Sequence, residues 1–345
     1  MSEDGRQDGG ARRGRRPRMA DVAARAGVSL VTVSRALGQP QLVSPETRQR
    51  VTAAVAELGY LPDLVAGSLA SSQTRIVGAV VPTLANSFFA ASVQGLSEVL
   101  DAAGYQLLLG NSGYDTRREQ SLAAAFLGRR ADGLVLTGSR HEAALRGVIA
   151  GAGVPVVETW ELPAEPLDMV AGFSNDAAAE AMTAGLLDWG YRRIAFVGLP
   201  DGGESRSDQR RKGWRRAHAD RGLEAGPHIA VEDANSPVGG EAALERALAL
   251  APAVDALFCA NDTLALGAIV ACQKAGVAVP GRIAVAGFGD FDLAPHLVPG
   301  LTTVRVPGGE MGETAGRMLL DRLAGRRVEP RVVDLGFEIV RRASA

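Results

Sequence analysis

The sequence predicts an N-terminal all-α helix-turn-helix domain with a hinge helix, joined to an α/β body of two doubly wound parallel-sheet lobes. Residues 19–59 contain three short amphipathic helical segments separated by glycine and serine signals. From Arg75 onward, short apolar runs alternate with helical segments, a pattern typical of parallel sheets covered by helices. The chain has 345 residues, more than one ordinary hydrophobic core requires.

Residues 1–18 are expected to form a disordered basic arm, because five arginines between positions 12 and 18 form a run with glycine and without apolar periodicity. Residues 1–75 hold 11 arginines against 7 acidic residues, although the whole chain has a net charge of −2. A basic front and an acidic body favour contact of the front with nucleic acid. The N-terminus has no apolar segment of a secretory signal, so we expect a cytoplasmic protein without a membrane span.

The first two helical segments have the spacing of a helix-turn-helix. Apolar residues at positions 19, 22, 23 and 26 lie on one face of a first helix, and Gly27 can end it. Ser29 can cap a second helix, whose buried stripe is then Val33, Ala36 and Leu37. A second helix of this kind has the right width for the major groove of DNA.

The outward residues of the second helix suit contacts with DNA. Hydroxyl groups and a helix N-terminus donate hydrogen bonds to phosphates, and Arg35 can reach a guanine edge. Leu30 and Val31 can touch thymine methyl groups, with packing inside the domain as the alternative for both. The candidate DNA-binding residues of this helix are Ser29, Leu30, Val31, Thr32, Ser34 and Arg35.

A third helix and a hinge follow. Ser44 can cap the third helix, Pro45 can begin it and Gly59 can end it, so residues 19–60 make one domain. The hinge spans residues 61–74. Its central residues, 64 to 69, can form a helix that is too short to be stable without a partner.

The body, residues 75–345, is expected to bind a small ligand where its strands end. The expected strands lie in "RIVGAVVP", "YQLLLGN", "GLVLTG", "PVVETW", "RIAFVGLP", "ALFCAND" and "IAVAGFGD". Ligands of doubly wound sheets bind beyond the carboxyl ends of the strands. The candidates at these ends are Asn86, Phe88, Phe89, Glu158, Trp160, Asn175, Asp176, Asn261, Asp262, Gly289 and Asp290.

No motif supports catalysis, a cofactor or a metal. The sequence contains no GxGxxG fingerprint, P-loop, GxSxG elbow or HExxH motif. Cys259 and Cys272 lie in apolar runs and are expected to be reduced core thiols, and the four histidines are scattered. We therefore expect a binding protein rather than an enzyme.

The segments "DVAARAGVSLVTVSRAL", "VSPETRQRV", "ELGYLP" and "CANDTLALGA" resemble the lactose-repressor/galactose-repressor (LacI/GalR) family of bacterial transcription regulators. The resemblance runs from about residue 19 to the C-terminus. It implies a homodimer that binds a pseudo-palindromic operator in double-stranded DNA, and a periplasmic-binding-protein-like body that senses a small molecule. It places Leu30, Val31 and Arg35 at base-reading positions, and Ala66 and Leu69 in a hinge that opens the minor groove.

Three positions depart from the family pattern. Gly38 and Asp63 each replace an asparagine, and Gly67 replaces a longer polar residue. Glycine should loosen the hinge helix by roughly 0.5–1 kcal/mol. An acid beside phosphates should weaken binding, and the basic arm is expected to compensate.

The resemblance also divides the body into two lobes. The first comprises about residues 75–173 and 306–334, and the second about 174–305 and 335–345. No leucine heptad follows "DLGFEIVRRASA", so the tail lacks the tetramerising helix of some relatives. A dimer is therefore expected rather than a tetramer.

The segment "ESRSDQRRKGW" favours an anionic effector. Arg206 and Arg210 are four residues apart and share a helix face, where they can hold a carboxylate or phosphate. Arg210 and Asn261 match effector-binding positions of the family. Gly289 stands where sugar-sensing members have a carboxylate, so an acid is lost and an arginine is gained.

A closer resemblance, to the gluconate-utilisation repressor subgroup, rests on "NSGYD", "PVVE", "AGFSND", "FCANDTLALGA" and "DLGFEIV". It implies a polyhydroxy acid effector, such as gluconate or 6-phosphogluconate, that releases the operator. His141 also resembles a histidine of that subgroup, with an ordinary surface histidine as the alternative. The competing interpretations are a family member that senses another sugar or a co-repressor, and a sugar-binding receptor with a similar two-lobed body.

Overall fold

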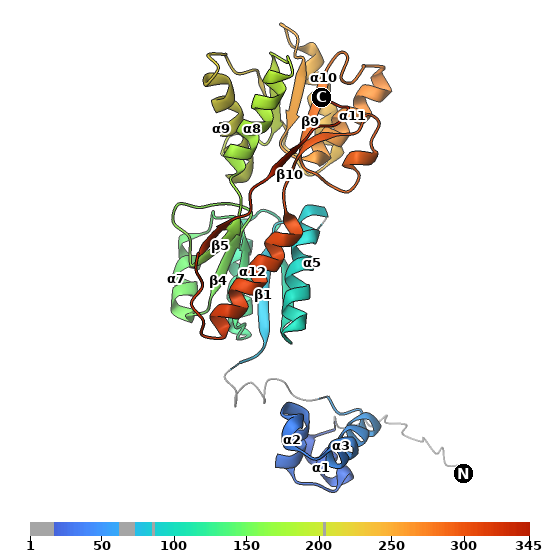
Figure 1. Cartoon of the computed structure of the whole chain (residues 1–345), viewed down its shortest axis with the longest axis vertical. Coiled ribbons are helices and arrows are strands. Elements are labelled where there is room, and N and C mark those ends of the chain that lie inside the picture. The colour runs from blue at the N-terminus through green and yellow to red at the C-terminus, as the bar shows by residue number, and fades with distance from the viewer. Residues whose placement is uncertain (1–16, 62–72, 85–86, 203–204) are drawn as a thin grey trace, which may run out of the picture. The chain divides into compact units, whose positions relative to one another are not determined.

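The computed structural model describes residues 17–61, 73–84, 87–202 and 205–345 (Figure 1). It divides into two units, Met1–Thr74 and Arg75–Ala345. The basic arm up to residue 16 and most of the hinge, with Ala66 and Leu69, lie outside the described residues, as do Asn86 and the side chain of Phe88. Within the described residues, no helix is both long and apolar enough to cross a membrane.

The first unit is a three-helix domain. Its elements are α1 (Met19–Ala26), α2 (Leu30–Gly38), the short 3-10 helix η1 (Pro40–Leu42) and α3 (Pro45–Leu58). Gly27, after α1, takes the left-handed conformation (φ 63°) that a tight turn between two helices requires. The core gathers around Val22, Val33 and Val51, all fully buried. Leu37 is 36% exposed, so its expected place in the buried stripe was wrong: the stripe of α2 ends at Ala36.

The first lobe of the body is a parallel sheet in the order β11-β5-β4-β3-β1-β2. Its strands are β1 (Ile76–Val81), β2 (Gln106–Asn111), β3 (Gly133–Thr137), β4 (Val156–Thr159), β5 (Met169–Gly172) and β11 (Val332–Asp334). Its helices are α5 (Ser87–Ala102), α6 (Thr116–Gly128), α7 (Ala143–Ala152) and α12 (Gly308–Leu323). Helices α5 and α12 approach closely, because a Cβ added at Gly312 would lie only 1.9 Å from the carbonyl oxygen of Ser92.

The second lobe repeats this plan in the order β12-β10-β9-β8-β6-β7. Its strands are β6 (Ile194–Gly198), β7 (His228–Ala230), β8 (Ala256–Cys259), β9 (Ala284–Gly289), β10 (Thr302–Arg305) and β12 (Glu338–Val340). Its helices are α8 (Asn175–Asp188), α9 (Ser205–Ala219), α10 (Pro237–Ala249), α11 (Asp262–Ala275) and the 3-10 helix η2 (Ala294–His296). The edge strand β12 is antiparallel to β10, so this sheet is not wholly parallel.

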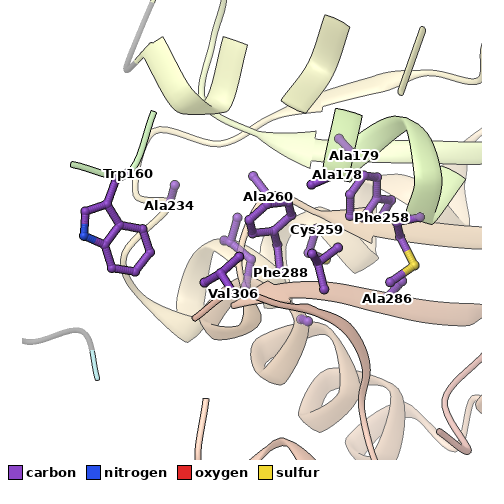
Figure 2. Packing of buried hydrophobic residues seen from close by; sticks show 14 of the residues in the cluster. Trp160, Ala178, Ala179, Ala234, Phe258, Cys259, Ala260, Ala286, Phe288 and Val306 are labelled. Atoms are coloured by element: carbon purple, nitrogen blue, oxygen red, sulfur yellow. The ribbon is translucent and has the colours of Figure 1, made fainter. Parts of the chain in front are cut away.

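The chain passes between the two lobes after β5, after β10 and after β11, and the two later crossings flank α12 (Figure 1). A row of aromatic rings lies along the crossings. The ring centroids of Phe89 and Trp160 are 4.8 Å apart, and Phe173 lies 6.2 Å from Trp160 and 6.1 Å from Phe288. Figure 2 shows Trp160 at one end of the cluster, near Ala234. The apolar core is therefore continuous from one lobe to the other.

Candidate functional site

The outer face of α2 is open to solvent and free of acidic residues. Leu30 is 51% exposed and Val31 58%, and Ser34 and Arg35 are exposed as well. The Oγ of Ser29 accepts a hydrogen bond from the backbone N–H of Thr32 (3.2 Å), and the two hydroxyl oxygens lie 2.9 Å apart. The first turn of α2 carries no acidic side chain, so its N-terminus is suited to an anion. The helix therefore presents apolar, hydroxyl and guanidinium groups together.

The body holds a first cavity between the lobes, at the carboxyl ends of strands from both sheets. It has a volume of about 40 Å³. Its lining residues are Phe89, Tyr114, Trp160, Leu199, Arg206, Ser207, Arg210, Ala234, Asn235, Ala260 and Asn261. This volume is far below the roughly 300 Å³ at which small-molecule sites begin. The first cavity is thus closed down around its own side chains.

Arg210 is held by the protein itself. Its Nε donates to Oδ1 of Asn175 (2.9 Å), and its Nη1 donates to the carbonyl oxygen of Ala260 (2.6 Å). The guanidinium also lies 3.8 Å from the ring centroid of Phe288. Arg206 and Arg210 line the same cavity, and two of the five N–H donors of Arg210 are used by Asn175 and Ala260 within the second lobe. The clamp in which both arginines hold an anion stays a prediction.

Trp160 joins the two lobes through its backbone. Its φ of 73° is left-handed, which is rare for a bulky residue and marks a position held by its surroundings. Its N–H donates to the sulfur of Met311 (3.2 Å), and its carbonyl accepts a hydrogen bond from Nδ2 of Asn175 (2.8 Å). Because Asn175 also accepts a hydrogen bond from Arg210, one hydrogen-bond network connects the wall of the first cavity to the chain crossing between the lobes.

A second cavity, of about 580 Å³, adjoins the first and shares Tyr114, Leu199 and Arg206 with it. Its other lining residues come from the first lobe: Pro82, Ser112, Asp115, Thr116, Glu119, Thr137, Gly138, Arg140, His141, Glu142, Ala143 and Glu161. This volume lies in the range of sites for small molecules. The lining is rich in charges of both signs, so the cavity suits a ligand that is both charged and polar.

Arg206 lies at the junction of the two cavities. It is 5% exposed, and its guanidinium carbon lies 5.5 Å from the ring centroid of Phe89. Gly138 faces both Arg206 and Glu161, since a Cβ there would lie 3.3 Å from Nη1 of the first and from Oε1 of the second. Ser139 and Gln209 donate to Oε2 of Glu161, at 2.5 and 3.0 Å. A buried acid and a buried base therefore stand together at this junction.

His141 is not a surface residue. Its side chain is fully buried, with Nδ1 2.8 Å from Oε2 of Glu119 and Nε2 3.2 Å from Oε1 of Glu158. Burial lowers the pKa of His141, but the hydrogen bonds and charges of the two carboxylates outweigh it and raise the pKa to about 9. The ring is thus an imidazolium at neutral pH, donating to an acid on either side.

Several expected ligand contacts have other partners. Asp290 bonds Arg305 (2.7 Å) and Arg342 (2.7 Å) and lines neither cavity. Glu158 also lines neither cavity. Its carboxylate oxygens accept hydrogen bonds from His141 and from the backbone N–H of Leu167 (2.6 Å). The roles of these two residues in effector binding therefore stay predictions.

Two further candidates are only partly available to a ligand. Asn261 lines the first cavity, yet its amide caps α11 and donates to the carbonyl of Ala234 (2.7 Å). Asp176 pairs with Arg216 at 2.6 Å, and this pairing holds the carboxylate of Asp176 on the surface side of α8. Hydrogen bonding to Ser174 and Arg216 lowers the pKa of Asp176 in spite of the opposing effect of burial.

The sequence-based set missed Tyr114, Glu119, Arg140, Glu161 and Asn235. Tyr114 donates from its hydroxyl to Oδ1 of Asn235 (3.0 Å), which joins the lobes across the first cavity. Most of these residues stand one to five positions after a strand end, a signal that the sequence did contain. Glu119 is the exception, since it lies inside α6.

Comparisons with known proteins agree with this architecture. Residues 18–63 match the family model for bacterial regulatory proteins of the lacI family, and residues 183–345 match a periplasmic binding protein-like domain. The HTH-type transcriptional regulator GntR of Escherichia coli (strain K12) is 37% identical over 94% of this chain and 97% of its own length. The HTH-type transcriptional regulator IdnR of the same strain is 31% identical over 95% of this chain and 98% of its own length.

Solved structures are similar as well. The transcription regulator GntR from Chromobacterium violaceum has a TM-score of 0.72 and 38% identity, covering 78% of this chain and 98% of its own. The lac repressor dimer bound to operator and an anti-inducer has a TM-score of 0.84 and 26% identity, covering 96% and 99%. A helix-turn-helix domain joined to a two-lobed ligand-binding body defines a DNA-binding transcriptional regulator. The chain belongs to the LacI family of these regulators, and the GntR regulators are among its similar relatives.

Proposed function

We propose that the protein is a cytoplasmic, non-catalytic homodimeric repressor of sugar-acid utilisation genes, released from its operator by a polyhydroxy acid such as gluconate or 6-phosphogluconate. The observation that supports this effector class is the position of Arg206, a buried cation at the junction of the two cavities, with Arg140 in the same lining. A carboxylate or phosphate beside such groups gains charge-assisted hydrogen bonds. The polar second cavity has room for the remaining carbons and hydroxyl groups.

The same proposal assigns the DNA contacts. Arg35, Leu30 and Val31 read base edges, while Ser29, Thr32 and Ser34 contact phosphates. The exposure of Leu30 and Val31 supports reading rather than packing, because buried residues fill the core of this domain without them. Ala66 and Leu69, outside the described residues, belong to the hinge that widens the minor groove at the operator centre.

Effector and operator would be coupled by a shift between two conformations of the body. An effector releases DNA only if it binds one conformation more tightly than the other. Polar contacts between the lobes would differ between such conformations, among them Tyr114 with Asn235, and Nη1 of Arg140 with the carbonyl of Gly202 (3.5 Å). A ligand that reorganises these contacts changes the angle between the lobes.

The experiment is fluorescence anisotropy of the protein on a labelled palindromic operator with a central CG step. Gluconate, 6-phosphogluconate, ribose and a purine are titrated at fixed salt, because salt alone shifts affinity by orders of magnitude. Release by the sugar acids only is the expected result. Release of the operator by ribose or by the purine would contradict a sugar-acid effector. Tighter operator binding in the presence of a sugar acid would mean that this acid is a co-repressor. Sedimentation of the free protein tests the dimer.

A further inference from the structure

A buried charged cluster that the anion contacts do not use borders the second cavity, which Glu119 and His141 line. The cluster consists of Glu119 on α6, His141 after β3, and Glu158 on β4. Arg206 and Arg140 are suited to the anionic end of an effector, but a six-carbon polyhydroxy acid also carries several hydroxyl groups. The first cavity, at about 40 Å³, has no room for them, whereas the second, at about 580 Å³, does.

The hydrogen bonds within the cluster use every acceptor oxygen except one oxygen of Glu119. Both ring nitrogens of His141 are used, one by Glu119 and one by Glu158. The second oxygen of Glu158 is used by the backbone N–H of Leu167. Glu119 is 6% exposed and lines the second cavity, and in the described part of the chain its Oε1 makes no hydrogen bond. Glu119 therefore contributes to the cavity lining a carboxylate of which one oxygen has no hydrogen-bond partner among the described residues.

We propose that Glu119 is the hydroxyl-binding residue of the second cavity and that His141 is the positioning residue that keeps it ionised and oriented. This inference rests on the proposed sugar-acid effector. It defines the orientation of the bound effector, with its acid group at Arg206 and Arg140 and its hydroxyl groups at Glu119. A carboxylate is acceptor-only, so it recognises hydroxyl donors and rejects a second acid group. The ligand class is a monoanionic polyhydroxy acid rather than a dicarboxylic acid.

The charges around His141 explain why both acids are retained. Glu119 and Glu158 contact its ring, and Glu142, Asp115 and Arg140 line the same cavity. The imidazolium separates the two buried carboxylates, and like charges without such a cation favour uptake of a proton by one of them. A protonated Glu119 would present a weaker acceptor to a hydroxyl group. The role of His141 is therefore electrostatic, and its loss should make ligand binding depend on pH.

The test is calorimetric titration of the full chain with three probes: gluconate, hexanoate, which lacks the hydroxyl groups, and glucitol, which lacks the acid. Wild type should bind gluconate well and the other two at least about 100-fold more weakly, since each lost charge-assisted hydrogen bond costs about tenfold or more. Glu119→Gln keeps the shape of the side chain and should weaken gluconate binding about tenfold. Glu98→Gln, an exposed acid on α5, is the matched control and should change nothing.

A second variant separates positioning from mere folding. His141→Gln should bind gluconate progressively more weakly than wild type as pH falls from 8 to 6, whereas a purely structural role would lower affinity by one factor at every pH. Thermal unfolding monitors whether the variant folds, and the nearly isosteric Glu119→Gln variant decides alone if it does not. Gluconate binding that is unchanged in Glu119→Gln would overturn the subsite only. Wild type that binds no sugar acid would overturn both the subsite and the effector class.

Discussion

The outer face of α2 and the cavity region of the body hold their polar groups in opposite ways. On α2, the side chains of Ser34 and Arg35 stand in solvent, and the cap of Ser29 is a bond to a residue three positions away. In the body, Arg210 and His141 are buried and bonded to residues 17 to 50 positions away. The exposed face of α2 can therefore change its residues without losing the fold, whereas the buried polar groups of the body are part of what stabilises their own unit.

Removal of Arg210 should give the largest effect on stability. Arg210→Ala leaves Oδ1 of Asn175 and the carbonyl of Ala260 buried without their donor, and it uncovers the face of Phe288. We expect a loss of about 3–5 kcal/mol in the free energy of unfolding of the body, together with loss of effector response. Urea unfolding measures the first and operator release the second.

The control for Arg210 is Arg215→Ala, on the exposed side of the same helix, which should cost less than about 0.5 kcal/mol. Operator affinity without effector should be nearly unchanged in both variants, because both arginines lie outside the helix-turn-helix unit. Equal stability of the two variants would mean that the buried contacts of Arg210 contribute nothing.

The protonation of His141 should give the next effect. Its pKa is raised from about 6.5 in the unfolded chain to about 9 in the folded protein. The stabilisation is therefore complete below pH 6.5, declines as pH rises from 6.5 towards 9, and is absent above 9. Its size is about 3 kcal/mol. The measurement is the difference in unfolding free energy between wild type and His141→Gln at pH 6 and at pH 9.5; a difference that is constant across this range contradicts a buried imidazolium.

The contrast between the two regions also explains what the sequence could predict. Helix α1 was predicted at Met19–Ala26 and lies there, and the cap at Ser29 was confirmed, because these features depend on residues within one helical turn. Leu37 was misplaced because its burial depends on where η1 turns away, which is not a local property.

In the body, strands β1, β2, β3, β4, β6, β8 and β9 were predicted from their apolar runs, and the short strands β5, β7, β10, β11 and β12 were not. The location of the candidate effector site, at the strand ends, was predicted, but only some of the residues that line the cavities were. The ion pairs of Asp290 were not predicted because its partners Arg305 and Arg342 come 15 and 52 residues later. Glu119 and His141 were missed as a pair because 22 residues separate them, and it is the tertiary packing of α6 against β1, β2 and α7 that accompanies their contact.

On the exposed side of the comparison, Arg35→Ala should weaken discrimination at one base pair by about 1–3 kcal/mol and leave the free energy of unfolding unchanged. The guanidinium is exposed and supports nothing in the described fold. Anisotropy on the operator and on a shuffled duplex at one salt concentration separates base reading from charge. Arg48 is an exposed arginine on α3, and Arg48→Ala should weaken binding to both duplexes by the same factor. If Arg35→Ala discriminates between the operator and the shuffled duplex as well as wild type does, Arg35 does not read a base.

The smallest effect tests whether an exposed site has any structural role at all. Ser29→Ala removes the cap of α2 and should cost about 1 kcal/mol in the stability of the helix-turn-helix unit. Ser44→Ala removes the equivalent cap of α3, whose Oγ accepts from the N–H of Thr47 at 3.4 Å, and should cost a similar amount. Only Ser29 also stands at the N-terminus that faces phosphate in our proposal, so only Ser29→Ala should weaken operator binding beyond its loss of stability. If both variants bind the operator equally, the hydroxyl of Ser29 is a cap and nothing more, and phosphate recognition falls to the backbone N–H groups of α2.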